Sequence, residues 1–154
     1  MSALEYSDSI DVSVPPDQLY AMVSDPTRMG EWSPVCKACW WDEGDGPGVG
    51  AWFTGRNVTP ERTWEARCQV VAADPAREFA WEVNNGWVRW SFTLEPRDEG
   101  TRLTESWAFL PAGLAGFGER FGDKAEAAIA DRVEAAHHGI PVTLAAIKKA
   151  AETS

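Results

Sequence analysis

Apolar and polar residues alternate along much of the chain, a pattern typical of β-strands that bury one face. The first such segment covers residues 9–14, and a second strand is expected over residues 35–41. The apolar positions of the later segments are rich in tryptophan and phenylalanine, whereas the positions between them are mostly charged or hydroxylated. This pattern predicts an antiparallel sheet with one buried face and one face in water. The five later segments are residues 51–58, 64–70, 79–83, 88–94 and 103–109.

Two short helical segments are predicted between the first and second strands. Pro15-Pro16 ends the first strand, and Asp17 then has the character of a helix N-cap. The apolar run that follows is stopped by Asp25-Pro26, because the residue before a proline avoids helical geometry. A second helical turn is expected over residues 27–32.

The period of the pattern changes to that of a helix from Gly118 onward. A straight helix over residues 118–152 would be about 52 Å long, whereas a globular chain of this length has a diameter of about 39 Å. Gly139 and Pro141 interrupt the helical pattern, so we expect a kink or a break at residues 139–141. The large apolar positions of this helix are Ile129, Val133, Ile140, Leu144 and Ile147.

Together these elements predict an α+β fold. The order is one strand, two short helices, six strands and a long C-terminal helix. A sheet with one apolar face needs a cover, and the C-terminal helix is the one long amphipathic element in the pattern. We therefore expect a curved, seven-stranded antiparallel sheet wrapped around that helix, in a single domain over residues 1–154.

Short motifs spread along the chain carry a resemblance to a known family. They are Ser9-Ile10-Asp11-Val12 leading to Pro16, Trp32-Ser33-Pro34, Gly50-Ala51-Trp52-Phe53-Thr54-Gly55-Arg56-Asn57, Trp64, Cys68-Gln69-Val70, Phe79-Ala80-Trp81, Gly100-Thr101-Arg102-Leu103-Thr104-Glu105 and Thr143-Leu144. On these motifs nearly the whole chain resembles the START-like, Bet v 1-like (SRPBCC) superfamily, in its polyketide cyclase/dehydrase-like branch. The resemblance implies a helix-grip fold around an internal cavity that holds a hydrophobic or aromatic small molecule. That superfamily includes ligand carriers, lipid-transfer proteins and aromatase/cyclases, so the fold does not choose among these functions.

The residues expected to face the cavity share the apolar side of the strand alternation, and Trp32 is expected at the cavity mouth. We interpret them as a cage in which a flat ligand stacks on aromatic rings, with Asn57 and Glu105 as polar anchors. The alternative is a solidly packed aromatic core, in which Asn57 satisfies a neighbouring backbone group. The candidate ligand-binding residues are Trp32, Phe53, Asn57, Trp64, Cys68, Trp81, Trp90, Phe92 and Trp107.

Glu105 is the candidate catalytic residue. Alternation places it on the apolar face between Leu103 and Trp107, where burial would raise the pKa of its carboxyl and suit it to general acid or base chemistry. The alternative is a carboxyl that is paired with an arginine or capped by hydroxyl groups. Aromatase/cyclases of the superfamily use a cavity arginine, but alternation turns Arg56 and Arg67 to the outer face. We therefore expect no inward arginine, which disfavours the cyclase interpretation.

Charge and composition exclude several other functions. The chain carries a formal net charge of −10, which disfavours binding to nucleic acid or to an anionic membrane surface. No segment is long and apolar enough to span a membrane, and the N-terminus has no secretory leader, so a cytoplasmic protein is expected. Three cysteines fit no disulfide framework.

Metal and cofactor chemistry is not expected. Cys36 and Cys39 form a CxxC motif, but residues three apart in a strand point to opposite faces, so both thiols should not meet one metal. A redox CxxC needs a helix N-terminus, and none is expected to follow here. His137 and His138 are adjacent on a helix, about 100° apart, and do not grip one ion. The glycine-rich segment 44–50 lacks the lysine of a phosphate loop, and we interpret it as a mobile lip at the cavity mouth, opposite Trp32.

The sequence therefore predicts a protein that binds a small hydrophobic, aromatic ligand in an internal tryptophan-rich cavity, as a monomer or homodimer and without a cofactor. One alternative is a cyclase/dehydrase-type enzyme acting on an aromatic or polyketide substrate, with Glu105 as the acid–base group and Asn57 orienting a carbonyl. A further alternative is a protein-interaction module that uses the exterior.

Overall fold

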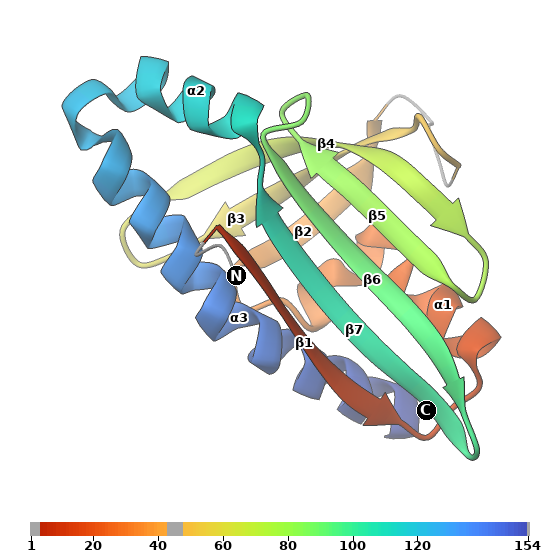
Figure 1. Cartoon of the computed structure of the whole chain (residues 1–154). Coiled ribbons are helices and arrows are strands. Elements are labelled where there is room, and N and C mark those ends of the chain that lie inside the picture. The colour runs from red at the N-terminus through yellow and green to blue at the C-terminus, as the bar shows by residue number, and fades with distance from the viewer. Residues whose placement is uncertain (1–3, 43–47, 154) are drawn as a thin grey trace.

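The described strands form one antiparallel sheet in the order β1-β7-β6-β5-β4-β3-β2, as Figure 1 shows. The structure is a computed structural model that describes residues 4–42 and 48–153. The predicted α+β arrangement with a curved seven-stranded sheet is confirmed. The strands are β1 (Glu5–Val12), β2 (Cys36–Trp41), β3 (Trp52–Val58), β4 (Thr63–Asp74), β5 (Glu78–Val83), β6 (Val88–Arg97) and β7 (Gly100–Phe109).

The first strand begins at Glu5 rather than at residue 9. Its continuous pairing with β7 runs from Glu5 opposite Ala108 to Val12 opposite Thr101, so the strand starts four residues earlier and ends two residues earlier than predicted. β1 lies at an edge of the sheet, and most of its side chains are exposed. An exposed edge strand does not require alternating apolar residues. The residues from Glu5 to Asp8 therefore carry no clear hydrophobic pattern that would predict a strand.

The two predicted short helices lie between β1 and β2. The first is α1 (Pro16–Val23), and the second is the 3₁₀ helix η1 (Pro26–Glu31). Asp17 does not cap α1: the N-cap is Pro15, and Asp17 lies in the first turn, where a carboxylate favours the positive end of the helix. The capping role falls instead to Asp25, whose side chain accepts a 3.0 Å hydrogen bond from the Thr27 backbone N–H at the start of η1.

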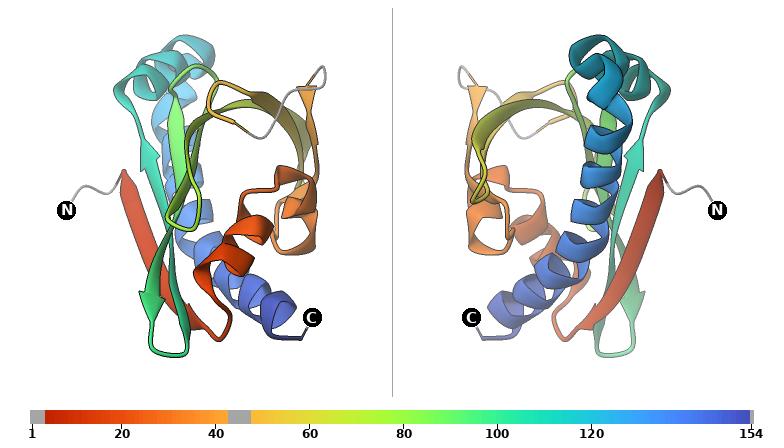
Figure 2. Two further views of the ribbon diagram at one scale, coloured as in Figure 1. Left: turned by 90° about the vertical axis from the view of Figure 1, so that its right-hand side faces the viewer. Right: turned by 90° about the vertical axis from the view of Figure 1, so that its left-hand side faces the viewer.

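The C-terminal helical segment breaks at a different place from the one predicted. It consists of α2 (Pro111–Phe121), the short 3₁₀ turn η3 (Gly122–Lys124) and α3 (Ala125–Thr153). The break falls at Gly122, which has a φ of 53°, whereas α3 continues through residues 139–141 with Pro141 in its interior. The helix bends along its length instead of ending there (Figure 2). No helix in the described ranges has the length and apolar composition to cross a membrane.

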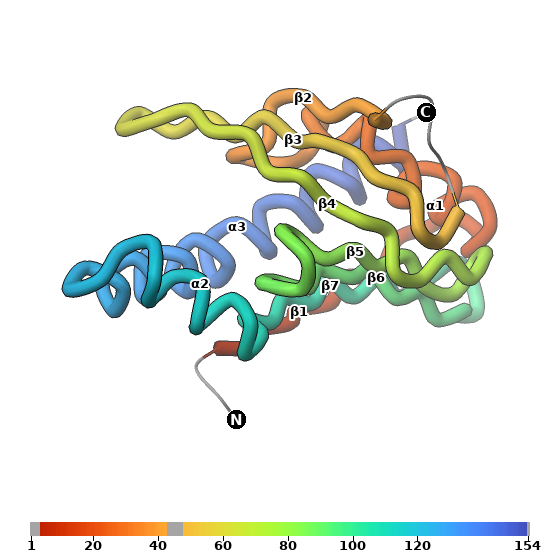
Figure 3. Tube along the Cα trace, turned by 90° about the horizontal axis from the view of Figure 1, so that it is seen from above, coloured from red at the N-terminus to blue at the C-terminus, as the bar shows by residue number. Residues whose placement is uncertain are grey.

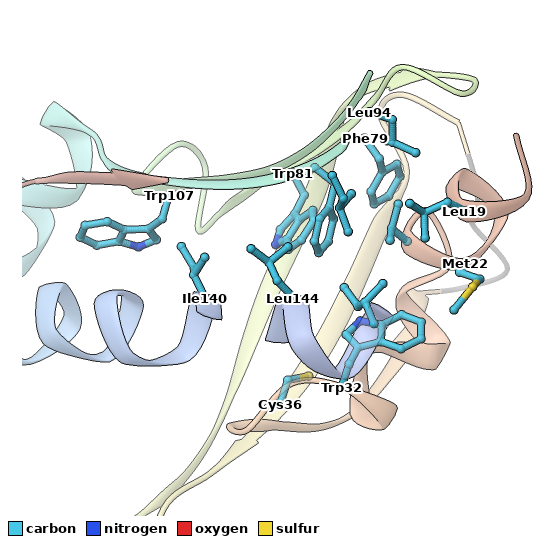
Figure 4. Close-up of a cluster of buried hydrophobic side chains, with 14 of the residues drawn as sticks. Leu19, Met22, Trp32, Cys36, Phe79, Trp81, Leu94, Trp107, Ile140 and Leu144 are labelled. Carbon is cyan, nitrogen blue, oxygen red and sulfur yellow. The ribbon is translucent and has the colours of Figure 1, made fainter. Parts of the chain in front are cut away.

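The core is concentrated at one end of α3. Ile140, Leu144 and Ile147 are at most 1% exposed, and α3 packs against β1 and β7. Trp81 and Trp107 point from the sheet toward Ile140 and Leu144 (Figure 4). In contrast, residues 125–135 of α3 are half-buried or exposed. The C-terminal half of α3 therefore holds the helix on the sheet, and the N-terminal half is only partly covered.

Helix α2 approaches the sheet closely because it carries glycines where it passes Trp87. A Cβ atom on Gly113 would overlap the Trp87 backbone carbonyl, and one on Gly116 would overlap the Trp87 ring. Trp87 also meets Phe117 edge-on, with ring centroids 5.8 Å apart. The helical periodicity did not reveal α2, because the helix makes its closest contacts with Trp87 at glycines, which add no apolar side chain to the pattern.

The close approach of α2 predicts opposite effects of alanine at two of its glycines. Gly116→Ala should lower the free energy of unfolding by about 1–3 kcal/mol, because the added methyl group forces the Trp87 ring to shift. Gly118→Ala, where nothing lies within 4 Å, should raise it by about 0.5–1 kcal/mol through helix propensity. Urea unfolding of both variants tests this, and equal effects would contradict the packing described here.

Candidate functional site

A cavity of about 800 Å³ lies between the sheet and α3. Its wall comes from strands β2 to β7, from η1 and α2, and from the face of α3 between Asp131 and Thr143. Seen from above, the β3–β4 hairpin and α3 diverge toward the end of the molecule where α2 lies (Figure 3). Sites for small organic molecules typically enclose roughly 300–1,000 Å³, so this space is large enough for a multi-ring ligand.

Three tryptophans stand side by side across the wall. Trp81 on β5 is opposite Trp90 on β6, and Trp90 is opposite Trp107 on β7. Directly paired residues share one face of a sheet, so the three indoles form a row. The rings of Trp81 and Trp90 stack with centroids 6.4 Å apart and planes 12° apart. The row presents a broad aromatic surface on which a flat apolar molecule can stack.

The structure brings every sequence-predicted site residue to this wall. Phe53, Phe92 and Trp107 are at most 3% exposed and are also part of the packed core. Asn57 and Trp64, in contrast, are only half-buried, as expected for side chains that border a space. That these residues bind a ligand stays a prediction. The wall includes Trp32, Phe53, Asn57, Trp64, Cys68, Trp81, Trp90, Phe92, Glu105 and Trp107.

Glu105 lies beside the tryptophan row with 5% of its surface exposed, opposite Phe92 in the strand register. Its Oε1 atom is buried and has no hydrogen-bond partner, and no arginine pairs with its carboxyl in the part of the chain that the structure describes. The structure therefore shows neither an arginine pair for this carboxyl nor a hydroxyl cap on Oε1. Burial raises the pKa of Glu105 well above its usual value of 4.5, so the carboxyl keeps its proton at pH values where ordinary glutamates ionise.

The thiols of Cys36 and Cys39 meet, contrary to the prediction. Their sulfur atoms are 3.2 Å apart, and both residues lie on the cavity wall. The pairing of β2 with β3 shifts register between Cys36 and Ala38. A bulge of this kind inserts a residue and turns both cysteines to one face. The third cysteine, Cys68, lies on the same wall, but within the described ranges no group of three or more potential metal ligands is formed.

Arginine also reaches the cavity, although none was expected there. Arg56 and Arg67 face outward as predicted, each in an ion pair on the outer face. Arg132 of α3, however, lines the cavity, and its guanidinium carbon lies 5.2 Å from the centre of the Trp64 ring. Strand alternation gave no signal for it, because it projects from a helix across the space to the sheet. Two further arginines of the wall are Arg62 and Arg120.

Other wall residues were also missed because they come from helices and turns. Phe117 and Phe121 are one turn apart on α2, with ring centroids 5.0 Å apart, and this i, i+4 spacing was a signal that the sequence offered. Trp87 lies in the turn between β5 and β6 and became identifiable only through its contact with α2. The missed apolar wall residues include Trp87, Phe117, Phe121 and Ile140.

Two motifs singled out in the sequence do not contribute to the cavity wall in the part of the chain that the structure describes. Neither His137 nor His138 lines the cavity, and His137 instead stacks on Tyr6 with centroids 4.2 Å apart. In the glycine-rich segment 44–50, residues 44–47 lie outside the described residues. The remaining three, 48–50, are exposed and take no part in the wall, so the described part of the segment does not form the predicted lip.

Comparison with known proteins supports the resemblance on independent grounds. A family model described as "Polyketide cyclase / dehydrase and lipid transport" matches residues 3–141. No curated protein matches the chain. The family match covers most of the residues that build the cavity, although it ends within α3.

Solved structures share the same fold. The solution structure of the Polyketide_cyc-like protein Cgl2372 from Corynebacterium glutamicum is 56% identical, with a TM-score of 0.71, and the match covers 97% of this chain and 92% of that one. The di-domain ARO/CYC StfQ from the steffimycin biosynthetic pathway is 18% identical, with a TM-score of 0.71 and coverage of 97% and 51%. Ara h 8.0201 is 17% identical, with a TM-score of 0.64 and coverage of 97% and 98%. The last two show a common fold only.

The unpartnered Glu105 carboxyl predicts a variant that is more stable than the natural protein. Glu105→Leu should raise the free energy of unfolding at pH 7 by about 1–3 kcal/mol, because it removes a buried polar atom that has no hydrogen bond. The raised pKa means that the folded protein retains a proton that the unfolded chain loses above about pH 4.5. The free energy of unfolding of the natural protein therefore falls as the pH rises from about 4.5 toward the raised pKa of Glu105. The leucine variant lacks this group and does not show that loss.

Urea unfolding at pH 4 and pH 7 measures this difference, which should be larger at pH 7. Glu105→Gln serves as the matched control, since it removes the titration while keeping a buried polar group of the same shape. A leucine variant that is less stable than the natural protein at pH 7 would show that Glu105 is satisfied in the fold.

Proposed function

The chain belongs to the polyketide cyclase/dehydrase and lipid transport family, and from this premise we propose that it binds a small hydrophobic, aromatic molecule in the cavity between its sheet and α3. The ligand stacks on the row formed by Trp81, Trp90 and Trp107. Glu105 then supplies the polar contact that orients it. The chain acts as a carrier or sequestering protein for this molecule.

The observation that carries this proposal is the unpartnered oxygen of Glu105 in an aromatic wall. A buried polar atom without a partner typically costs about 1–3 kcal/mol, and such atoms are rare in folded proteins. A ligand that brings a donor or acceptor removes this cost when it binds. A packed core would gain nothing from a carboxyl at this position, whereas a binding site gains orientation and selectivity.

The aromatic surface supplies most of the affinity in this account. Ring contacts between a flat ligand and the indoles contribute about 0.5–1.5 kcal/mol per pair beyond the burial of apolar area. A protonated carboxyl donates one hydrogen bond and accepts another, which suits a ligand carbonyl or hydroxyl. Asn57, on the same wall, offers a second polar contact from the opposite side of the sheet's curve.

A second candidate is an enzyme of the cyclase/dehydrase type, and the same carboxyl supports it. A glutamate whose pKa is raised by burial is suited to give and take protons near neutral pH. Under this candidate Glu105 is the acid–base group, and Asn57 orients a substrate carbonyl. Glu105→Gln then abolishes turnover of an aromatic or polyketide substrate, whereas a carrier shows no turnover with either side chain.

Filling the cavity tests the binding function directly. Ala66, a half-buried residue of β4 that lines the cavity, is replaced by tryptophan. Ala66→Trp should weaken binding of the neutral fluorophore N-phenyl-1-naphthylamine at least tenfold, because the new indole occupies the ligand space. Fluorescence titration of the probe, with quenching of intrinsic tryptophan emission, gives the dissociation constants.

The matched control places the same indole on the other face of the same strand. Gln69, whose amide donates a 3.2 Å hydrogen bond to the Gly50 carbonyl on the outer face, is replaced by tryptophan and should leave probe binding within twofold. Thermal unfolding confirms that both variants are folded. If the natural protein does not bind the probe, or if Ala66→Trp binds it unchanged, the cavity is not a ligand site.

A further inference from the structure

Three arginines gather at the end of the cavity that lies between the β3–β4 hairpin and the two C-terminal helices. Arg62 comes from the turn before β4, Arg120 from α2 and Arg132 from α3, and all three line the cavity. Arg62 and Arg120 are also exposed to solvent. Because the same residues border both the cavity and the solvent, we call this end of the cavity the mouth.

The arginines at the mouth are held on aromatic rings that belong to the wall. The guanidinium carbons of Arg62 and Arg132 lie 4.1 Å and 5.2 Å from the centre of the Trp64 ring. Arg132 also lies 5.7 Å from the centre of the Phe117 ring on α2, so its side chain lies between a ring of the sheet and a ring of the neighbouring helix. Contact with ring faces positions guanidinium groups without using their hydrogen-bond donors, which leaves those donors available to a ligand.

The positive charge at the mouth is only partly balanced by the protein. No carboxylate lies within 4 Å of the Arg62 or Arg120 side chains among residues 4–42 and 48–153. Within the same described ranges, the one carboxylate paired with Arg132 is that of its neighbour Asp131, at 3.5 Å. Burial, together with the charges of Arg62 and Arg120, lowers the pKa of Arg132. Besides Asp131 and Glu105, the cavity lining includes two acidic residues, Glu61 and Glu65, and Glu65 is paired outside with Arg56.

We propose that the ligand is an aromatic oxyanion, whose rings lie on the tryptophan row and whose carboxylate, sulfonate or phosphate group sits among Arg62, Arg120 and Arg132 at the mouth. This inference rests on the proposed binding function and adds the charge of the ligand. Guanidinium groups recognise oxyanions through paired, charge-assisted hydrogen bonds. In a protein of net charge −10, such a cluster also gives a negatively charged ligand a favourable point of entry.

Two fluorescent probes that differ by a single negatively charged group test the proposal. 8-Anilino-1-naphthalenesulfonate is N-phenyl-1-naphthylamine with one added sulfonate. The double variant Arg62→Gln/Arg120→Gln should bind the sulfonate probe about tenfold more weakly, with a several-fold smaller loss for the neutral probe. Affinity of the natural protein for the sulfonate probe should also fall with added salt. The control is Arg77→Gln, an exposed arginine that does not line this cavity, which should change neither affinity.

The possible results distinguish a failure of the oxyanion site from a failure of the binding function. If the neutral probe binds and both probes lose affinity equally in the double variant, the arginines do not recognise an anion, and the binding function stands. If neither probe binds the natural protein, both the binding function and the oxyanion site are overturned.

The paired thiols of Cys36 and Cys39 support a second inference that does not depend on the ligand. Their sulfurs are 3.2 Å apart, about 1.2 Å beyond the length of a disulfide bond. Gly55 on the neighbouring strand makes room for both: a Cβ atom there would lie 3.1 Å from the Cys39 sulfur and 3.4 Å from the Cys36 sulfur. The hydrogen bond between the thiols lowers the pKa of Cys36 and raises that of Cys39. Because both thiols lie on the cavity wall and within bonding reach of each other, one can attack an incoming disulfide and the other can resolve the mixed disulfide; the lowered pKa of Cys36 favours it as the attacking thiol.

We infer that Cys36 and Cys39 form a thiol–disulfide exchange site that takes small disulfides entering through the cavity. The Cys36 thiolate attacks a sulfur of the incoming disulfide, which forms a mixed disulfide and releases one thiolate. Cys39 then loses its proton and attacks the Cys36 sulfur of the mixed disulfide, which closes the protein disulfide and releases the second thiolate. The protein dithiol is oxidised, and one molecule of disulfide is reduced to two thiols.

Reaction of the folded protein with 5,5′-dithiobis(2-nitrobenzoate) tests this inference. The natural protein should release two equivalents of thionitrobenzoate, retain no adduct and lose two hydrogens by mass spectrometry. Cys39→Ser should release one equivalent and keep the mixed disulfide, and Cys36→Ser should react at least tenfold more slowly. The double variant Cys36→Ser/Cys39→Ser is the control and should release almost no thionitrobenzoate, since burial raises the pKa of the remaining Cys68 thiol. A natural protein that releases no thionitrobenzoate, or that retains an adduct on Cys36, would overturn the inference.

Discussion

The uneven burial of α3 is the constraint on which the rest of the structure depends. Ile140, Leu144 and Ile147 face β1 and β7 and are almost fully buried, and each such side chain contributes roughly 1.5–3 kcal/mol by leaving water. The preceding half of the helix, residues 125–135, is rich in alanine and acidic residues and has no comparable stripe. The helix is therefore anchored to the sheet mainly through its C-terminal half. The sheet curves away from the helix toward β2. It therefore encloses a space that residues 125–135 of α3 do not fill.

The chemistry of that space follows from which elements border it. The sheet contributes indoles in register and one carboxyl whose Oε1 atom finds no hydrogen-bond partner in the described part of the chain. The helices and the β3–β4 turn contribute guanidinium groups that rest on the rings of Trp64 and Phe117. A largely apolar wall with a small number of placed polar groups is the usual composition of a small-molecule site. The same low polarity that makes an unpartnered Glu105 costly also strengthens any hydrogen bond that a ligand makes to it.

Much of the site was predictable because strand alternation is a local property. A period of two places Trp81, Trp90 and Glu105 on one face whatever surrounds them, and each lies on the wall of the cavity. The same rule failed for Cys36 and Cys39, where a register shift between β2 and β3 breaks the period. A bulge depends on how two strands pair, and a single strand's sequence carries little sign of it. Arg132 was missed for a related reason, since it reaches Trp64 across a gap whose width depends on how the helix is seated.

The amino-acid sequence by itself determined the number of strands, their buried face, the aromatic character of the wall and the burial of Glu105, because each depends on spacing along the chain. The tertiary structure alone decided where the C-terminal helix breaks, that Pro141 is accommodated within α3, that three arginines share one mouth and that two thiols touch. These features arise from contacts between segments far apart in sequence. Such contacts are set by the balance of packing and charge over the whole fold rather than by local periodicity.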